Sequence, residues 1–494
     1  MTGEATTTVP PRRVLPLLLV GYAAFYLCRA NVEPALNLLA IDHGYDNEQI
    51  GVVMAIALGA YAAGKLVLGP LADLWGGKRI MVLSLLGTAL VSLAIAASDA
   101  PRRFGAGAGL VVVGALVVAN RFVQAGGWGG LVHVVGVTFG ASRRGTIMGV
   151  LSTSYDVGNV LALVLSAALV EAGAGWRALF VVNPLIVLAV AILVHLALPT
   201  PRAGSSGPAR ATAGPSTDAT GATGSTDATP GPSTDATGAT DATPGPSTDA
   251  DAARAGVSRA GATEPRFAAI ALRLARQPAF WFATGLSFFL TFVRAGFMTW
   301  TPRFLYEVSV AANAPSATSS SIARSAFFGV AGIIGSVATG RISDRLGPGR
   351  RAPVMTTSLA LLVGCTLALA HAGVTSPLVA TAGVAACGLF LLGPYSLLAG
   401  AVSLDVASPA RADGAAPEAE PDTRGAASAA GFIDAVGYVG ASLAALVLGS
   451  VSKRAGWTAA FDVVAVVSCL ALVLAWTWSR RRPSTSEREP AASA

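Results

Sequence analysis

The sequence contains twelve separate apolar stretches, each long enough to cross a lipid bilayer as a helix of about 20 residues. The whole chain is 53% hydrophobic and only 12% charged, whereas an average soluble domain carries about a quarter charged residues. These features predict an all-α membrane protein with twelve transmembrane helices. The expected spans are residues 14–39, 50–71, 80–98, 107–131, 145–170, 177–198, 278–300, 323–341, 353–372, 377–402, 426–449 and 458–479.

Basic residues gather in alternate loops between these spans, at Arg12, Lys78, Arg144 and Arg480 among other positions. Lys and Arg concentrate in the cytoplasmic loops of membrane proteins. We therefore expect both ends of the chain in the cytoplasm, and the protein itself in a bacterial cytoplasmic (inner) membrane. The net charge of +7 is explained by these loops and does not indicate a nucleic-acid partner.

A long polar segment divides the chain into two halves. It is rich in Pro, Gly, Ser, Thr, Asp and Ala, and it repeats the unit Gly-Pro-Ser-Thr-Asp-Ala. Such a composition cannot bury enough apolar surface to fold. We predict an N-terminal six-helix bundle over residues 1–198, a disordered cytoplasmic linker over 199–265, a C-terminal six-helix bundle over 266–482, and a disordered tail over 483–494.

Two arginines lie in the middle of predicted spans, at corresponding places in the two halves. Arg29 is in the segment Tyr-Leu-Cys-Arg-Ala of the first span, and Arg294 is in Thr-Phe-Val-Arg-Ala of the seventh. An intramembrane arginine is costly unless it faces protein or water, so it marks a functional site. On a continuous helix, Tyr22, Tyr26 and Glu33 share one face with Arg29. The pattern predicts one polar cavity between the two halves.

Two other motifs also occur once in each half. The loop after the second span reads Gly-Pro-Leu-Ala-Asp-Leu-Trp-Gly-Gly-Lys-Arg, and the loop after the eighth reads Gly-Arg-Ile-Ser-Asp-Arg-Leu-Gly. The last span of each half opens with Ala-Gly-Trp-x-Ala-x-Phe. Three motifs in the same order indicate a parallel duplication of a six-span unit.

The loop sequences resemble the signature loop of the major facilitator superfamily, and the resemblance implies the major facilitator fold. Glycine allows close helix packing and a sharp turn, aspartate caps a helix or pairs with arginine, and basic residues keep the turn in the cytoplasm. The loop residues are expected to form a motif that takes part in the conformational change. They are Gly69, Asp73, Lys78, Arg79, Gly340, Asp344 and Arg345.

Three further ionisable residues within the predicted spans, Arg121, Asp156 and Asp434, are candidates for a role beside Glu33. Arg121 belongs to a sequence similar to the Arg-x-x-Gln-Gly motif of many superfamily members, and it is either a cavity cation or a structural hydrogen-bond donor. Asp156 and Asp434 are expected to face the cavity or to pair with a cation, and an ion pair that only packs helices is the alternative. With Glu33, these residues are expected to balance charge or to carry a coupling ion.

Several segments are similar to those of one family within the superfamily. They are Tyr22-x-x-x-Tyr26-x-x-Arg29-x-Asn31, Ala60-Tyr61-x-x-x-Lys65, Arg294-x-Gly296-x-x-x-Trp300-x-Pro302, Gly393-Pro394 and Gly437-Tyr438-x-Gly440. Through them the chain resembles the organophosphate:phosphate antiporters, which include glycerol-3-phosphate and hexose-6-phosphate transporters. In that family two arginines bind the phosphate, and tyrosines and a lysine line the cavity. The resemblance implies substrate binding by Arg29, Arg294, Lys65, Tyr22, Tyr26, Tyr61 and Tyr438.

The fifth span departs from that family. Tyr155 and Asp156 stand where the family has histidine and asparagine, and we expect Tyr155 to line the cavity as well. Together with Glu33 and Asp434, Asp156 makes the predicted cavity less positive than that of the family.

The sequence therefore predicts a secondary transporter that exchanges a phosphate ester, either glycerol phosphate or sugar phosphate, for inorganic phosphate by alternating access. An arginine fork matches phosphate oxygens bidentately. One alternative is a proton-coupled symporter or exporter of another organic anion, since a protonated carboxylate can carry a proton in the membrane. Another is a sensor with a transporter fold. No enzyme motif is found, and we expect a monomer without cofactor or metal.

Overall fold

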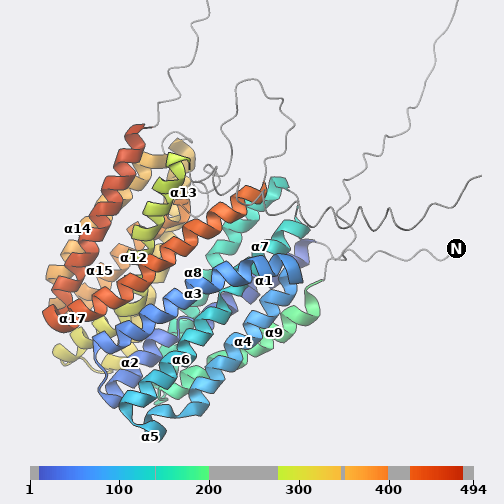
Figure 1. Ribbon diagram of the computed structural model, residues 1–494. Helices are drawn as coiled ribbons and strands as arrows, with labels where there is room; N and C mark the ends of the chain where they lie inside the picture. The colour runs from blue at the N-terminus through green and yellow to red at the C-terminus, as the bar shows by residue number, and fades with distance from the viewer. Residues whose placement is uncertain (1–10, 140, 200–275, 347–350, 399–422, 482–494) are drawn as a thin grey trace, which may run out of the picture. The chain divides into compact units, whose positions relative to one another are not determined.

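The computed structural model describes residues 11–139, 141–199, 276–346, 351–398 and 423–481 (Figure 1). These residues form helices and no strand. The predicted linker and tail lie outside them. The helices of the first half are α1 Pro11–Leu27, α2 Val32–His43, α3 Asn47–Trp75, α4 Gly77–Ser98, α5 Ala100–Phe104, α6 Ala106–Gln124, α7 Gly126–Thr138, α8 Ala141–Glu171 and α9 Trp176–Ala197.

The second half contains longer helices. They are α12 Pro278–Ala311, α13 Ala317–Leu346, α14 Arg351–Ala372, the 3₁₀ turn η2 Gly373–Thr375, α15 Pro377–Leu397 and α17 Thr423–Arg481.

The described residues contain eleven helical stretches that are long and apolar enough to cross a membrane. The last of them, Phe432–Arg480, has 49 residues, and its backbone leaves the helical region at Gly456, where φ is 80°. Gly456 therefore divides this stretch into two spans. The count becomes twelve, and the prediction of a twelve-helix, multi-pass membrane protein is confirmed.

Two predicted spans are not single helices, which corrects the sequence-based assignment. The first span consists of α1 and α2 with a break at residues 28–31, and the fourth consists of α6 and α7 with a break at Ala125. Hydrophobic periodicity cannot show such breaks, because the apolar character continues across them.

Residues up to 200 and residues from 271 onward form one unit. Within the first half, α1 packs against α8 and α9, and α4 packs against α6, α7 and α9. Within the second half, α12 packs against α17, α13 and α15, while α14 packs against α15 and α17. The halves meet where α3 packs against α17, α8 against α13, and α2 against α12.

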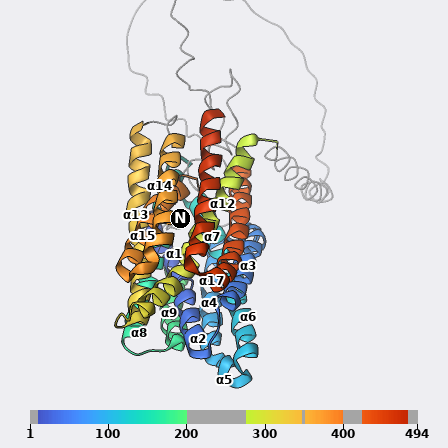
Figure 2. The same cartoon turned by 90° about the vertical axis from the view of Figure 1, so that its left-hand side faces the viewer.

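We call the end of the helix bundle at which α1 begins the near end, and the opposite end, where the chain passes from α2 to α3, the far end. Figure 2 shows α2 and α5 at this far end, in the lower part of the view. At the near end, the turn between α3 and α4 uses Gly76 with a φ of 89°, a conformation that only glycine adopts readily. The predicted sharp turn of the signature loop is therefore present.

Candidate functional site

Arg29 lies in the break between α1 and α2. The sequence feature that favours this break is Pro34, because proline has no N–H to donate to the carbonyl of Ala30 and its ring crowds that carbonyl. Pro34 is instead accommodated in the first turn of α2, where a missing N–H costs little. The backbone reconnects through hydrogen bonds from Ala30 N to Tyr26 O at 2.9 Å and from Val32 N to Arg29 O at 3.4 Å.

Polar side chains of α6 complete the hydrogen bonding of this break. Gln124 donates to the carbonyl oxygens of Phe25 at 3.4 Å and Cys28 at 3.3 Å, and Arg121 Nη2 donates to that of Arg29 at 3.0 Å. In a membrane, a carbonyl freed from a helix has to find another donor within the protein. Arg121 therefore acts as a structural donor, and it also lines the central cavity, so both alternatives that the sequence left open apply to it.

Three tyrosine rings surround the Arg29 guanidinium. Its Cζ lies 4.2 Å from the ring centre of Tyr61, 5.3 Å from that of Tyr26 and 5.5 Å from that of Tyr438. Arg29 Nη2 also donates a hydrogen bond to the Tyr438 hydroxyl at 3.1 Å. Because Tyr438 belongs to α17, a side chain of the second half reaches the arginine of the first.

Arg294 has the reciprocal arrangement on the continuous helix α12. Its Cζ lies 4.9 Å from the ring centre of Tyr155 and 4.8 Å from that of Tyr395. Tyr155 belongs to α8 of the first half, so each arginine contacts a tyrosine of the opposite half. Tyr395 was not predicted from the sequence, although it follows directly after the Gly393-Pro394 pair on which the family resemblance partly rests.

Two glycines allow this arrangement through close helix contacts. A Cβ on Gly158 would lie 2.4 Å from the carbonyl oxygen of Ala23, so α8 approaches α1 more closely than any other residue would allow. A Cβ on Gly437 would lie 2.7 Å from Ser287 Oγ and 2.8 Å from Thr291 Oγ1, which is the same situation between α17 and α12. These contacts bring Tyr155 and Tyr438 to the centre of the molecule.

Arg29 and Arg294 line a single central cavity. Its volume is about 30 Å³, which is room for about two water molecules, so a larger ligand requires the cavity to widen. Arg29 is 8% exposed and Arg294 is 6% exposed. The lining residues are Tyr26, Arg29, Glu33, Leu58, Arg121, Thr291, Arg294, Ala295, Met298, Thr299, Tyr438 and Ala441.

The carboxylates near the cavity have cationic partners other than these two arginines. Glu33 forms an ion pair with Arg121 at 2.8 Å, and Asp434 forms one with Lys65. Glu33 thus has its ion-pair partner on α6, and its electrostatic interaction with Arg29 is the weaker of the two. Among the described residues, no carboxylate lies within ion-pair distance of Arg29 or Arg294.

Asp156 is the remaining buried carboxylate of the predicted set. It neighbours Tyr155 on α8, is 7% exposed, and interacts electrostatically with Arg294. Within the described part of the chain it has no ion-pair partner within 4 Å.

Tyr22 does not share the position of the other predicted tyrosines. Its ring packs 5.8 Å from that of Tyr26 and 5.2 Å from that of Trp128, within the apolar core of the first half. It is not among the cavity-lining residues, and neither are Tyr61, Tyr155 and Lys65, although these three lie beside Arg29, Arg294 or Tyr438. The prediction that Tyr22, Tyr26, Arg29 and Glu33 share one continuous helical face is wrong, because the helix is interrupted after Leu27.

The predicted conformational motif is only partly described. Lys78 donates a hydrogen bond to the carbonyl of Leu198 at the end of α9. Arg79 and Arg345 are exposed. Gly69 lies against Gly129 of α7, because a Cβ added to Gly129 would lie 3.1 Å from the Cα of Gly69. Gly340 has open space around it. The side chains of Asp73 and Asp344 lie outside the described set.

Polar contacts connect the two halves at the far end. Asn47 donates to Ser452 Oγ at 3.2 Å, and Lys453 pairs with Asp46 at 3.0 Å and with Glu48 at 2.9 Å. Arg454 also pairs with Glu48, at 3.0 Å. The far end of the interface is therefore closed by ion pairs and hydrogen bonds.

Asp46 combines two roles at this closed end. Its side chain caps α3 by accepting a hydrogen bond from the Gln49 backbone N–H at 2.9 Å, within a capping box. Partial burial opposes ionisation, but hydrogen bonds from Gln49 and Lys453 outweigh it and lower the pKa of Asp46 below its ordinary value. The stabilisation by ionised Asp46 is therefore present above the ordinary pKa and is lost as pH falls through the lowered value.

Twelve spans in two similar halves, with a polar cavity enclosed between them, define the class of membrane transporters that work by alternating access. The model of the Major Facilitator Superfamily matches residues 18–416. The chain belongs to this superfamily.

Several known proteins are similar over nearly the whole chain. The glycerol-3-phosphate transporter of Bacillus subtilis (strain 168) is 23% identical over 467 residues, which are 94% of this chain and 91% of that protein. A protein of Chlamydia pneumoniae named "Probable hexose phosphate transport protein" is 23% identical over 488 residues, which are 96% of this chain and 93% of that protein.

Solved structures show the same fold. A bacterial homologue of the human lysosomal transporter Spinster, crystallised in an inward-facing and unoccupied conformation, has a TM-score of 0.67 at 15% identity, with 97% of this chain and 98% of that chain covered. The xylose transporter XylE from E. coli has a TM-score of 0.64 at 13% identity, with 97% and 99% covered.

Proposed function

We propose that the protein is a secondary active transporter that exchanges a phosphate ester, either glycerol phosphate or a sugar phosphate, for inorganic phosphate. The observation that carries this proposal is the pair of arginines, one from each half, that line one cavity and have no carboxylate within ion-pair distance among the residues that the structure describes. A phosphate monoester carries nearly two negative charges at neutral pH. Two guanidinium groups match this charge and bind its oxygens through parallel N–H donors.

Charge also explains why exchange is favoured over net transport. Without a bound anion, Arg29 and Arg294 are two uncompensated cations, and enclosing them in a drier, narrower cavity is unfavourable. A bound phosphate group neutralises both and draws the halves together. The carrier therefore changes conformation readily only when it is loaded with one of the two exchanged anions.

The Lys65–Asp434 ion pair adds a contact that depends on the same anion. Lys65 Nζ lies 4.9 Å from the ring centre of Tyr438, which is the tyrosine that binds Arg29. An anion held at Arg29 is thus close enough to compete with Asp434 for Lys65. Because the pair joins α3 to α17, this competition loosens one connection between the halves when substrate arrives.

The direct test is a counterflow assay in proteoliposomes loaded with inorganic phosphate. Labelled glycerol 3-phosphate or glucose 6-phosphate should enter in exchange for internal phosphate, with no need for a pH gradient. Carboxylates of similar size serve as the control panel and should enter far more slowly. Equal entry of carboxylates and phosphate esters would contradict the proposal.

Asp156 favours a second candidate, which is proton-coupled transport of the anion. Ionised Asp156 would reduce the positive charge near Arg294, while protonated Asp156 would leave it undiminished. A proton on Asp156 would then accompany the anion. Glu33 and Asp434 are weaker candidates, because each already has a cationic partner.

Two amide variants distinguish these candidates when uptake driven by a pH gradient is measured beside counterflow. Glu33→Gln should keep counterflow, with a shifted affinity and an unchanged response to the gradient. If Asp156 carries the proton, Asp156→Asn loses gradient-driven accumulation and keeps counterflow, since exchange needs no net proton movement. If the protein is a simple phosphate antiporter, neither variant changes the response to the gradient.

The location of the protein is part of the same proposal. We propose that it is a monomer in a bacterial cytoplasmic membrane. The charges of its loops support an orientation with both chain ends in the cytoplasm. The near end is then cytoplasmic and the far end external. Labelling of a single cysteine placed at His43, at the far end of α2, should succeed from outside intact cells, and labelling only after permeabilisation would reverse this orientation.

A further inference from the structure

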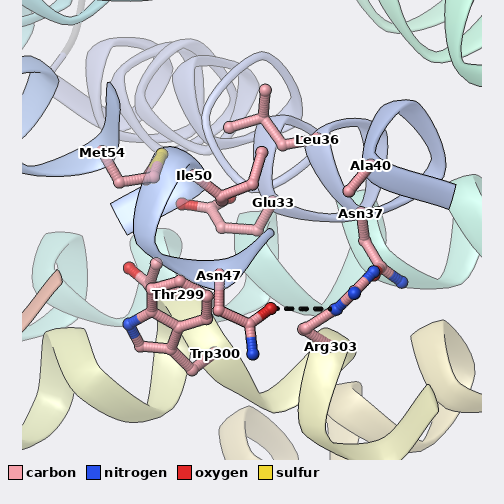
Figure 3. Close-up of a pocket in the computed structure, with 10 residues that line it drawn as sticks. All are labelled: Glu33, Leu36, Asn37, Ala40, Asn47, Ile50, Met54, Thr299, Trp300 and Arg303. Carbon is pink, nitrogen blue, oxygen red and sulfur yellow. Dashed lines mark hydrogen bonds between the residues drawn. The ribbon is translucent and has the colours of Figure 1, made fainter. Parts of the chain in front are cut away.

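A second cavity lies between α2, α3 and α12, on the far side of the central one. Figure 3 shows the residues that line it. Its volume is about 10 Å³, which is room for one water molecule. Glu33 and Thr299 line both cavities and therefore separate them. The lining residues are Glu33, Leu36, Asn37, Ala40, Asn47, Ile50, Met54, Thr299, Trp300 and Arg303.

This far cavity contains two buried hydrogen-bond donors without a partner among the described residues, beside acceptors that include the Glu33 carboxylate. Asn37 is 4% exposed and Trp300 is 2% exposed, and neither Asn37 Nδ2 nor Trp300 Nε1 has a partner among the described residues. A buried N–H without an acceptor costs free energy. The guanidinium of Arg303, which also pairs with Glu307, adds a positive charge to the same lining. The Glu33 carboxylate pairs with Arg121. A phosphate group, which supplies acceptor oxygens, can accept from the N–H groups of Asn37 and Trp300 and from Arg303.

Arg303 holds the two halves together in the present conformation. From α12, its Nε donates to Asn47 Oδ1 at 3.1 Å and its Nη1 donates to Asn37 Oδ1 at 3.2 Å, and Figure 3 shows the guanidinium between these two side chains of α3 and α2. Its Nε also donates to Glu307 on its own helix, at 2.7 Å. Parting of the halves at the far end would release Arg303 from both asparagines and leave only Glu307.

We infer that the far cavity is the closed form of a second anion-binding subsite, in which Arg303, Trp300 and Asn37 hold a phosphate group when the far end is open. The subsite precedes Arg29 and Arg294 on the path of the anion, and the anion passes between Glu33 and Thr299 to reach them. This inference rests on the proposed function, because it takes the same phosphate group as its ligand.

A purely structural role for Arg303 predicts the opposite result from a binding role. If Arg303 only locks the far end, its removal favours the conformation that is open at the far end, and the apparent affinity for anions added on that side rises. If Arg303 binds the arriving anion, that affinity falls. The sign of the change therefore decides between the two roles.

The experiment measures half-saturation for glycerol 3-phosphate, and inhibition by inorganic phosphate, in right-side-out and inverted membrane vesicles. Arg303→Gln removes the charge and the fork but keeps an amide that can bond to the asparagines. Half-saturation should rise on the order of tenfold, the contribution of one charge-assisted hydrogen bond, only where the far end faces the added substrate. A fall on that side, an equal rise on both sides or no change would overturn the inference.

Trp300→Phe is the second variant, because it keeps an aromatic ring and removes only the N–H. It should raise half-saturation two- to fivefold on the far side alone, and it keeps the inference testable if Arg303→Gln does not fold. Arg294→Gln is the control, which should weaken binding from both sides. If the wild-type protein transports neither probe, the proposed function and the inference both fall. If it transports them but the two variants act on both sides, only the inference falls.

Discussion

The two arginines of the central cavity hold corresponding positions in the sequence but have different surroundings. Arg29 lies in a helix break, is enclosed by three tyrosine rings and donates to Tyr438. Arg294 lies on the uninterrupted α12, is flanked by two rings, and has no hydrogen-bond partner for its Nε within the described part of the chain. Duplication has thus kept the charge at both positions while the supporting backbone has diverged.

The two arginines are therefore held in position by different parts of the protein. The carbonyls around Arg29 are held by Arg121 and Gln124, so the position of Arg29 depends on α6. Arg294 is positioned by its own helix, which is 34 residues long, runs on to the far end and there carries Arg303. A movement of α12 therefore moves Arg294 in the central cavity and Arg303 at the far end together.

The largest expected effect tests whether the two arginines act as equals. Arg29→Lys and Arg294→Lys keep the charge but lose the planar fork, so each should reduce counterflow on the order of a hundredfold, as expected for loss of a bidentate charge-assisted contact. Arg102→Lys, at an exposed position of α5, is the matched control and should behave as the wild type. Near-normal exchange by either variant would mean that the anion is held by one half alone.

The next largest effect is a loss of stability, which we expect for a variant beside Arg29 in the first half and not for a variant beside Arg294 in the second. Arg121→Leu leaves Glu33 as an unpaired buried carboxylate and removes the donor from the Arg29 carbonyl, which should cost about 3–5 kcal/mol. Thermal unfolding of the purified protein in detergent measures this loss. The double variant with Glu33→Gln should recover part of it, because the unpaired charge is then absent.

Thr291→Val, on the same helix as Arg294, is the variant to compare with Arg121→Leu. Thr291 Oγ1 is buried and has no partner among the described residues, so its removal should leave the unfolding temperature almost unchanged. A loss as large as that of Arg121→Leu would show that both arginines depend on polar support, and the contrast between the halves would disappear.

The smallest expected effects compare a tyrosine of the apolar core, Tyr22, with a tyrosine that contacts Arg29, Tyr438. Tyr22→Phe should change half-saturation by less than about twofold, because Tyr22 packs behind Tyr26 in the apolar core and lines no part of the cavity. Tyr438→Phe removes the hydroxyl that accepts from Arg29, and it should weaken exchange by about three- to tenfold, the contribution of one hydrogen bond. Similar losses in both variants would place Tyr22 at the substrate after all.

The sequence by itself determined the membrane class, the twelve spans, the duplication and the two arginines. These properties are local or periodic: a span is recognised by its length and apolar character, and a mid-span arginine is too costly to be incidental. The turn at Gly76 was also predictable, because its motif requires a backbone conformation that favours glycine.

Only the tertiary structure decided where the first helix breaks and which charges are paired. Pro34 makes a break possible, but α9 continues across Pro184 and α12 continues across Pro302, so proline alone does not determine the outcome. The break at Arg29 depends on donors that α6 brings to the freed carbonyls. It in turn directs Glu33 to Arg121, and among the described residues Arg29 has no carboxylate within ion-pair distance. Such pairing between distant segments has no signal in the local sequence.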